Sequence, residues 1–264
     1  MIALVSAVTA VVATLVGYWN LQVSDRQADL TEQGQHQDRF DRAVERLGNQ
    51  TALEVRLGAI MSFDRLVNDS PGFRESVVGM LAGFVREQAP AKACDTPGTV
   101  KPDIQAALDS IGKHYRSPGK DSPGYALNLR STCLQGANLS GHTFDRADLG
   151  GSNLSGALLN GTRFAGAYLM RTNFSRSFLM RADFTCASIV LANFSESTLV
   201  ATDMTGAELM APNFQNTTLW QVNLSFATMT DVVLTPEQED GVSRATTTKI
   251  FCAPPDNYAQ APAW

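Results

Sequence analysis

A large apolar side chain returns every five residues from Leu129 to Leu234 without a break. Each of these central positions is Leu, Phe, Ile or Met. An α-helix repeats its faces every 3.6 residues and a strand every two, so neither element explains a period of five. A fixed short period indicates stacked repeats that bury their apolar side chains only against their neighbours. The chain is therefore predicted to coil, with one pentapeptide on each side of the coil.

Two further positions follow the same period. A small residue usually lies two positions before the central residue, and Asn or Asp often lies directly before it. In an extended segment the central and small side chains share a side, so we expect both to point inward and the Asn or Asp to have a structural role. The position that is normally small holds a larger residue at three places, His142, Pro212 and Val222. We expect local distortion at Pro212 and Val222, and no ligand role for His142 at the start of the stack.

The phenylalanines predict the number of sides. Two sets of central residues step by twenty, namely Phe144, Phe164 and Phe184, and Phe174, Phe194 and Phe214. Four pentapeptides per coil would stack each set into a column, on two opposite sides. The period alone also permits other even numbers of sides. These six residues are the predicted solenoid core.

The segment Leu127 to Leu234 resembles the pentapeptide-repeat family, whose motif is A(D/N)LxX. The resemblance implies an all-β, right-handed, quadrilateral β-solenoid. The segments "LTEQGQHQDRFDRAVERLG", "VRLGAIMSFDRL", "FVREQAP" and "PDIQAAL" are similar to those of a group of membrane-anchored bacterial pentapeptide-repeat proteins. That likeness implies a transmembrane helix and a small α-helical module before the solenoid, and no activity.

The predicted organisation has five parts. Residues 1–24 form a transmembrane anchor, and 25–90 form an α-helical module with apolar residues at intervals of three, four and seven. Residues 91–124, rich in Pro and Gly, are interpreted as a connector around one short helix. Residues 125–234 form the solenoid. Residues 235–264 form a cap and tail, because Thr235, Pro236 and Gln238 have the pattern of a capping box that could cover the last coil.

The anchor prediction depends on residues 2–19, which carry no charge and end in Tyr18 and Trp19. Such a run is about long enough to cross a bilayer core, and aromatic residues favour the membrane interface. A cleaved signal peptide would need a basic start and a small-residue cleavage site. A buried soluble helix is the other alternative. The lipid bilayer is therefore an expected partner.

The orientation is predicted from the cations. No Lys or Arg precedes the apolar run, whereas Arg26, Arg39, Arg42 and Arg46 follow it. The positive-inside tendency places the body of a single-pass protein in the cytoplasm. The four cysteines are scattered and form no CxxC pattern, so we interpret them as buried or idle thiols of a reducing compartment.

No catalytic constellation is present in the sequence. The three histidines His36, His114 and His142 lie in different regions, and there is no Gly-rich phosphate loop or GxSxG motif. We predict no enzyme activity, no cofactor and no metal site. A net charge of −5 gives no basic face, so direct nucleic-acid binding is not expected.

Some pentapeptide-repeat proteins imitate the acidic surface of DNA and bind gyrase, which is the alternative hypothesis. Such mimicry needs a strongly negative rod, and the repeat carries five arginines among its acids. It would gain support if the acids shared one face.

The favoured hypothesis is a membrane-tethered scaffold that presents a surface to an unknown protein partner or to a second copy. The candidate surface is an outward apolar stripe of Met170, Met180, Val190, Val200, Met210 and Trp220. The alternative is that this stripe packs under the helical module or the C-terminal tail.

Overall fold

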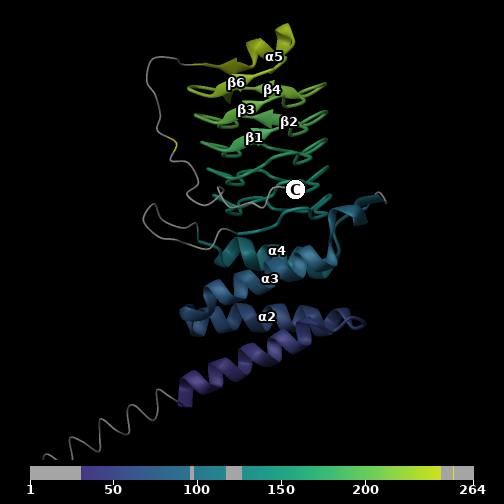
Figure 1. Cartoon of the computed structure of the whole chain (residues 1–264), viewed down its shortest axis with the longest axis vertical. Coiled ribbons are helices and arrows are strands. Elements are labelled where there is room, and N and C mark those ends of the chain that lie inside the picture. Colours follow the sequence, from purple (N-terminus) through teal and green to yellow (C-terminus); the bar gives the residue numbers. More distant parts are fainter. Residues whose placement is uncertain (1–30, 96–97, 117–126, 245–251, 253–264) are drawn as a thin grey trace, which may run out of the picture.

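The computed structural model describes residues 31–95, 98–116, 127–244 and 252, and it shows a stack of helices below a stack of coils (Figure 1). Residues 2–19 and the other anchor residues lie outside this described part. Within the described ranges, no helix is both long enough and apolar enough to cross a membrane.

The helical part begins with a helix over residues 31–47, followed by α2 (Leu53–Asp69) and α3 (Arg74–Gln88). The short 3-10 turn η1 (Pro71–Phe73) joins α2 to α3, and η2 (Ala91–Asp95) follows α3. These helices coincide with the three apolar patterns of the predicted module. Their inward faces are fully buried, as at Phe63 and Leu81.

The short helix predicted inside the connector at 91–124 is present. Helix α4 (Pro102–His114) lies between the other helices and the first coil (Figure 1), and it packs against both α2 and α3. Ile104, Leu108 and Ile111 have no solvent exposure. This helix therefore packs together with α2 and α3 beneath the first coil.

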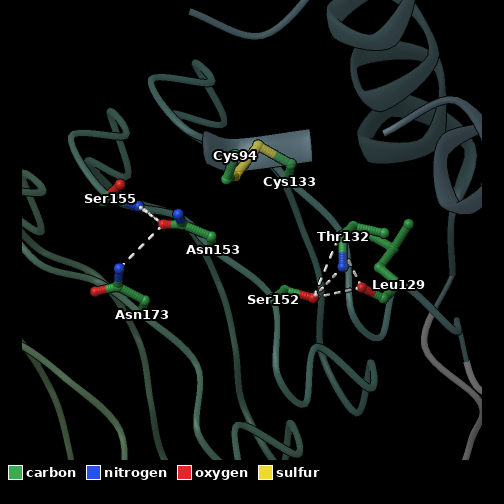
Figure 2. Close-up of a disulfide and its surroundings, with 8 residues drawn as sticks. All are labelled: Cys94, Leu129, Thr132, Cys133, Ser152, Asn153, Ser155 and Asn173. Atoms are coloured by element: carbon green, nitrogen blue, oxygen red, sulfur yellow. Dashed lines mark hydrogen bonds between the residues drawn. A yellow bond between two sulfur atoms is a disulfide. The ribbon is translucent and has the colours of Figure 1, made fainter. Parts of the chain in front are cut away.

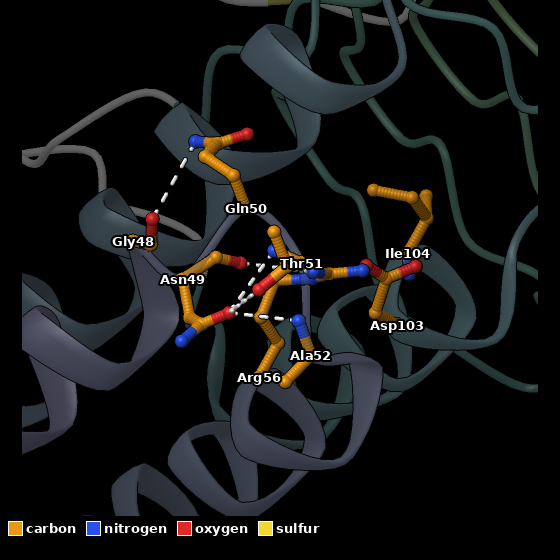
Figure 3. Close-up of polar contacts among 8 residues, drawn as sticks. All are labelled: Gly48, Asn49, Gln50, Thr51, Ala52, Arg56, Asp103 and Ile104. Carbon is orange, nitrogen blue, oxygen red and sulfur yellow. Dashed lines mark hydrogen bonds and ion pairs between the residues drawn. The ribbon is translucent and has the colours of Figure 1, made fainter.

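A polar contact fixes α4 to α2. The Arg56 guanidinium donates from Nε to Asp103 Oδ2 at 2.7 Å, and both side chains are largely buried. Arg56 also donates to the Asn49 carbonyl, and the Asn49 side chain accepts from the N–H groups of Thr51 and Ala52 ahead of α2 (Figure 3). A paired charge is tolerated inside a module, whereas removal of one partner leaves the other buried and unpaired.

The repeat forms coils that pair in parallel with a step of twenty residues. In the lower coils single bridges such as Asn153↔Asn173 make this register, and in the upper coils short strands make it. The strands are β1 (Ser188–Val190), β2 (Thr198–Val200), β3 (Glu208–Met210), β4 (Thr218–Trp220), β5 (Val222–Asn223), β6 (Thr228–Thr230) and β7 (Val242–Ser243). The sheets have the orders β1-β3-β6, β2-β4 and β5-β7. A step of twenty over pentapeptides gives the four-sided coil.

The six core phenylalanines lie in two interior columns, as their steps of twenty predict. Neighbours within a column stack, with ring centroids 5.1 Å apart for Phe164 and Phe184 and 5.0 Å apart for Phe174 and Phe194. Rings of the two columns meet edge to face, as between Phe174 and Phe184 at 5.8 Å. Offset stacks and edge-to-face pairs are the favourable arrangements of aromatic rings, so the columns stabilise the coil from within.

Every corner of the coil is left-handed. The residue two positions after each central residue has positive φ from Ser131 to Asp231, and seven of these residues are glycines. The others are side-chain-bearing residues such as Arg181 and Leu191, with φ of 57° and 56°. An L-residue in this conformation costs about 1–2 kcal/mol, so the interior packing must offset strain at each such corner.

Where Asn or Asp precedes a central residue, its side chain supports the turn that follows. Asn173 Oδ1 accepts from the N–H of Ser175, and Asp183 Oδ1 accepts likewise from Thr185. On one side the amides also form a ladder, in which Asn173 Nδ2 donates to Asn153 Oδ1 at 3.2 Å (Figure 2). The expected structural role of this position is confirmed.

The three departures from the small position do not break the stack. Pro212 precedes Asn213, which keeps its bridge to Asn193, and Val222 is buried in β5. The strand pairing shows none of the local distortion expected at these two positions. His142 lies against α4, where a Cβ on Gly112 would overlap its ring.

The last coil is covered by α5 (Pro236–Asp240), as predicted. Thr235 and Gln238 form the capping box of this helix, and the Gln238 side chain donates to the carbonyls of Phe214 and Thr217. The Phe214 carbonyl also accepts from the Thr217 N–H, whereas the Thr217 carbonyl has no coil above it to supply a backbone donor. The buried glutamine therefore satisfies a carbonyl that the end of a solenoid would leave unpaired.

The prediction of free thiols is wrong. Cys94 is bonded to Cys133, which ties η2 to the first coil (Figure 2), and Cys186 is bonded to Cys252, which ties the C-terminal region to a corner. The paired cysteines are 39 and 66 residues apart in the sequence, so no local spacing motif predicts their pairing. Disulfides persist mainly in oxidising compartments, so the cysteines no longer support a reducing one.

Candidate interaction surface

The predicted apolar stripe does not form one surface. Its six residues divide between two sheets, with Met170, Val190 and Met210 in the column of β1 and β3, and Met180, Val200 and Trp220 in the column of β2 and β4. Residues ten apart are two pentapeptides apart, which is half a turn of a four-sided coil. The two halves of the stripe therefore lie on opposite sides.

The side that contains β2 and β4, here named the Trp220 side, is the more apolar and exposed of the two. Leu158 is 40% exposed, Phe178 and Met180 are each 49% exposed, and Trp220 is 60% exposed. The bridges Leu158↔Phe178 and Phe178↔Thr198 and the pairing Val200↔Trp220 align these side chains vertically. The helical module does not cover these side chains, which remain exposed. The alternative that the stripe packs under this module is therefore excluded for the Trp220 side.

The Trp220 side carries no ionisable residue in its two outward columns. One column is Asn138, Leu158, Phe178, Thr198 and Thr218, and the other is Ser140, Asn160, Met180, Val200 and Trp220. Arg176 and Arg181 lie at its two corners, and Arg176 pairs with Glu196 at 2.9 Å. An uncharged apolar strip with charges only at its margins has the character of a protein contact surface.

The opposite side, which contains β1 and β3, mixes apolar and charged groups. Arg130 lies 5.8 Å from the centre of the Tyr168 ring and donates to Asp148. Burial raises the pKa of Asp148 above its ordinary value, while the Gly150 N–H and the Arg130 guanidinium oppose that rise. Glu208 lies higher in the same column and accepts from Ser188. These charges make this side less suited to an apolar partner.

The acids of the repeat do not gather on one face. Asp145, Asp183 and Asp203 share a side, but Arg163 lies between them and pairs with Asp145 at 2.7 Å and with Asp183 at 3.7 Å. Asp148 and Glu208 lie on the β1 side. A continuous negative strip, which DNA mimicry requires, is absent from the described coils.

The histidines occupy structural positions. His114 lies 3.0 Å from Asp64, which also accepts from Ser110, and burial lowers the pKa of His114 despite this carboxylate. Burial likewise lowers the pKa of His142. Ser110 donates to the carboxylate and not to the imidazole, so the cluster lacks the nucleophile–base contact of a hydrolytic triad. Among the described residues, no group of His, Cys, Asp and Glu gathers in a number able to hold a metal.

Comparison with known proteins agrees with the geometry of the coils. The model of the family described as "Pentapeptide repeats" matches in 8 copies, over residues 127–161, 147–185 and 187–225. No curated protein sequence matches the chain significantly.

Several solved structures are similar to the repeat. A pentapeptide repeat protein from the thylakoid lumen of Arabidopsis thaliana is 26% identical, over 43% of this chain and 72% of its own, with a TM-score of 0.23. HetL, a regulator of heterocyst differentiation from the cyanobacterium Nostoc, is 28% identical over 38% of this chain and 55% of its own, with a TM-score of 0.21. The fluoroquinolone resistance protein QnrB1 is 13% identical over 44% of this chain and 67% of its own, with a TM-score of 0.22.

The TM-scores are too low to carry an argument about function. The family match coincides with the parallel register of twenty residues and with the left-handed corners. On this evidence the repeat segment of the chain belongs to the pentapeptide-repeat family.

Proposed function

We propose that the protein is a non-enzymatic, membrane-tethered scaffold whose solenoid presents the Trp220 side to a protein partner. The observation that carries this proposal is the exposure of Phe178, Met180 and Trp220 on a rigid side without ionisable groups. Surface apolar residues that stand alone need no explanation, but a contiguous aligned group indicates a contact site.

Rigidity supports the role of a presenting surface. Backbone hydrogen bonds join this side to both neighbouring coils. Arg181 N donates to the Val200 carbonyl in the coil above, and Phe178 N donates to the Ala157 carbonyl in the coil below. Little conformational entropy remains to be lost when a partner binds such a side, which favours association.

The tether is the part of the proposal that depends on residues 2–19. Their uncharged apolar run supports a membrane anchor, and the arginines after it favour a cytoplasmic body. The two disulfides favour an oxidising compartment instead. The arginines alone now favour placing the body of the protein in the cytoplasm. Thiol alkylation in intact cells tests this placement directly.

Inhibition of gyrase by DNA mimicry receives no support from the arrangement of charges. Arg163 pairs with Asp145 and Asp183 and so interrupts the run of acids on that side. The likeness to QnrB1 is too low in identity to transfer a partner.

The proposal is tested by membrane fractionation combined with crosslinking of the full chain in native membranes. We expect the protein to stay in the membrane fraction after a carbonate wash, and to form a crosslinked adduct through the Trp220 side. Release by carbonate would refute the tether. Adducts that form equally well in a Met180→Asp/Trp220→Asp variant would refute the Trp220 side as the contact surface.

A further inference from the structure

We infer that the partner of the Trp220 side is a second copy of this chain, arranged in parallel about a twofold axis that runs along the solenoid. This inference rests on the proposed function, because it names the partner of the surface proposed there. It is argued from the chemistry of the side, its internal symmetry, its area and the position of the anchor segment.

The first argument is electrostatic. A surface that meets its own copy brings each charge near an identical one, which is unfavourable unless opposite charges alternate. The outward columns of the Trp220 side contain no ionisable group, so self-contact places no like charges against each other there. At one margin Glu196 already neutralises Arg176, which lowers the repulsion that two copies would meet.

The second argument is the placement of the large side chains. A twofold axis along the solenoid sets the column of Phe178 against the column of Met180 in the second copy, at the same height. Phe178 of each copy then meets Met180 of the other, and Trp220 meets Thr218. Sulfur–aromatic contacts of this kind are favourable, and the repeated pair occurs twice because of the symmetry.

The third argument comes from the area. Four side chains exposed by 40–60% offer roughly 400 Å² per copy, about half of what one partner contributes to a standard stable interface. Contact of this size is weak between molecules free in solution. Two chains tethered in one membrane share an orientation and a thin layer of space, which lowers the entropy lost on association and favours such a weak contact.

The direction of the axis follows from the tether. The helical module lies at one end of the solenoid (Figure 1), and the proposed anchor precedes that module in the sequence. A parallel pair brings both modules to the same end, as two anchors in one bilayer require. An antiparallel pair would direct the two anchors to opposite ends.

The test replaces Phe178 with a photoreactive benzoylphenylalanine in the full-length chain in native membranes. We expect an ultraviolet-dependent adduct of two copies, with the crosslink close to Met180 of the second copy. The same probe at Gln215, which is exposed on the side of the asparagine ladder, should give none. Adding Trp220→Asp or Met180→Ser should lower the yield of the adduct about tenfold, which corresponds to about 1.4 kcal/mol. Unchanged thermal melting of these surface variants establishes that they fold.

The other outcomes separate this inference from the proposed function. An adduct at position 178 that contains a different protein would overturn self-association and leave the scaffold function standing. A crosslink within one chain to residues 245–264 would overturn self-association and show that the tail covers the side. No adduct at position 178 would overturn both proposals for this side.

Discussion

The side chain of Gln105 in α4 pairs with both backbone groups of Asn138 in the first coil. Gln105 Nε2 donates to the Asn138 carbonyl at 2.8 Å, and the Asn138 N–H donates to Gln105 Oε1 at 2.9 Å. These are the groups that a coil below would engage. One primary amide therefore replaces a missing strand, and it does so from the short helix that the sequence predicts within the connector.

The two ends of the solenoid should respond differently to loss of their glutamines. Gln238 is buried, so Gln238→Ala leaves the Thr217 carbonyl unpaired and removes the second donor of the Phe214 carbonyl, which should cost about 1–3 kcal/mol. Gln105 is more accessible, so Gln105→Ala should cost about 0.5–1.5 kcal/mol because water replaces the lost partner. Urea unfolding curves measure both. A larger loss for Gln105→Ala would contradict this assignment of the caps.

Phe174 and Phe178 are a matched pair for testing the interior column. Phe174 has no exposure and stacks on Phe194, whereas Phe178 is about half exposed on the Trp220 side. Phe174→Ala should destabilise the solenoid by about 3–5 kcal/mol. Phe178→Ala should cost less than about 1 kcal/mol, because its side chain keeps water contact in the folded state. Similar melting temperatures for the two variants would argue against the column.

The corner conformation predicts opposite effects for two glycine substitutions. Gly161 has φ of 66° and Gly58 lies inside α2, and a Cβ would meet nothing within 4 Å at either position. Gly161→Ala should therefore destabilise by about 1–2 kcal/mol through backbone strain alone. Gly58→Ala should stabilise by about 0.5–1 kcal/mol through helix propensity. Thermal unfolding compares the two, and a stabilising Gly161→Ala would exclude a strained corner.

The disulfides predict that no thiol reacts until the protein is reduced. All four cysteines are bonded, so maleimide should add to none in the unreduced, denatured chain and to all four after reduction. Cys94→Ser/Cys133→Ser should lower stability by about 2–4 kcal/mol, because the loop closed in the unfolded state is lost. Quantitative labelling of unreduced protein taken from cells would instead show that the bonds do not form there, and would favour a reducing compartment.

The buried histidine His114 predicts weaker folding in acid. Burial lowers its pKa in the folded protein below the ordinary value of 6.5. The unfolded chain therefore takes up a proton first as the pH falls through that value, and this uptake favours unfolding. Stability should fall as the pH drops from neutrality below 6.5. His114→Gln should flatten this decline, and His142 contributes in the same direction. Urea midpoints at a series of pH values provide the measurement, and an equal slope in the variant would refute the role of His114.

The sequence by itself determined the coil, its interior and its C-terminal cap. The step of twenty between Phe164 and Phe184, and the capping box from Thr235 to Gln238, follow from residues close in the chain or repeated at a fixed interval. A repeated or local pattern is enough to predict the structure of its segment, because each pentapeptide has the same shape and contacts only its neighbours.

The same step of twenty places Met170 and Met180 on opposite sides, because ten residues are half a turn of the coil. Only the tertiary structure decided which cysteines pair and what covers the first coil. Cys186 meets Cys252, and Gln105 meets Asn138, across long separations without any period. Contacts of this kind depend on how the helices and the C-terminal segment pack against the coils, and local sequence does not encode that packing.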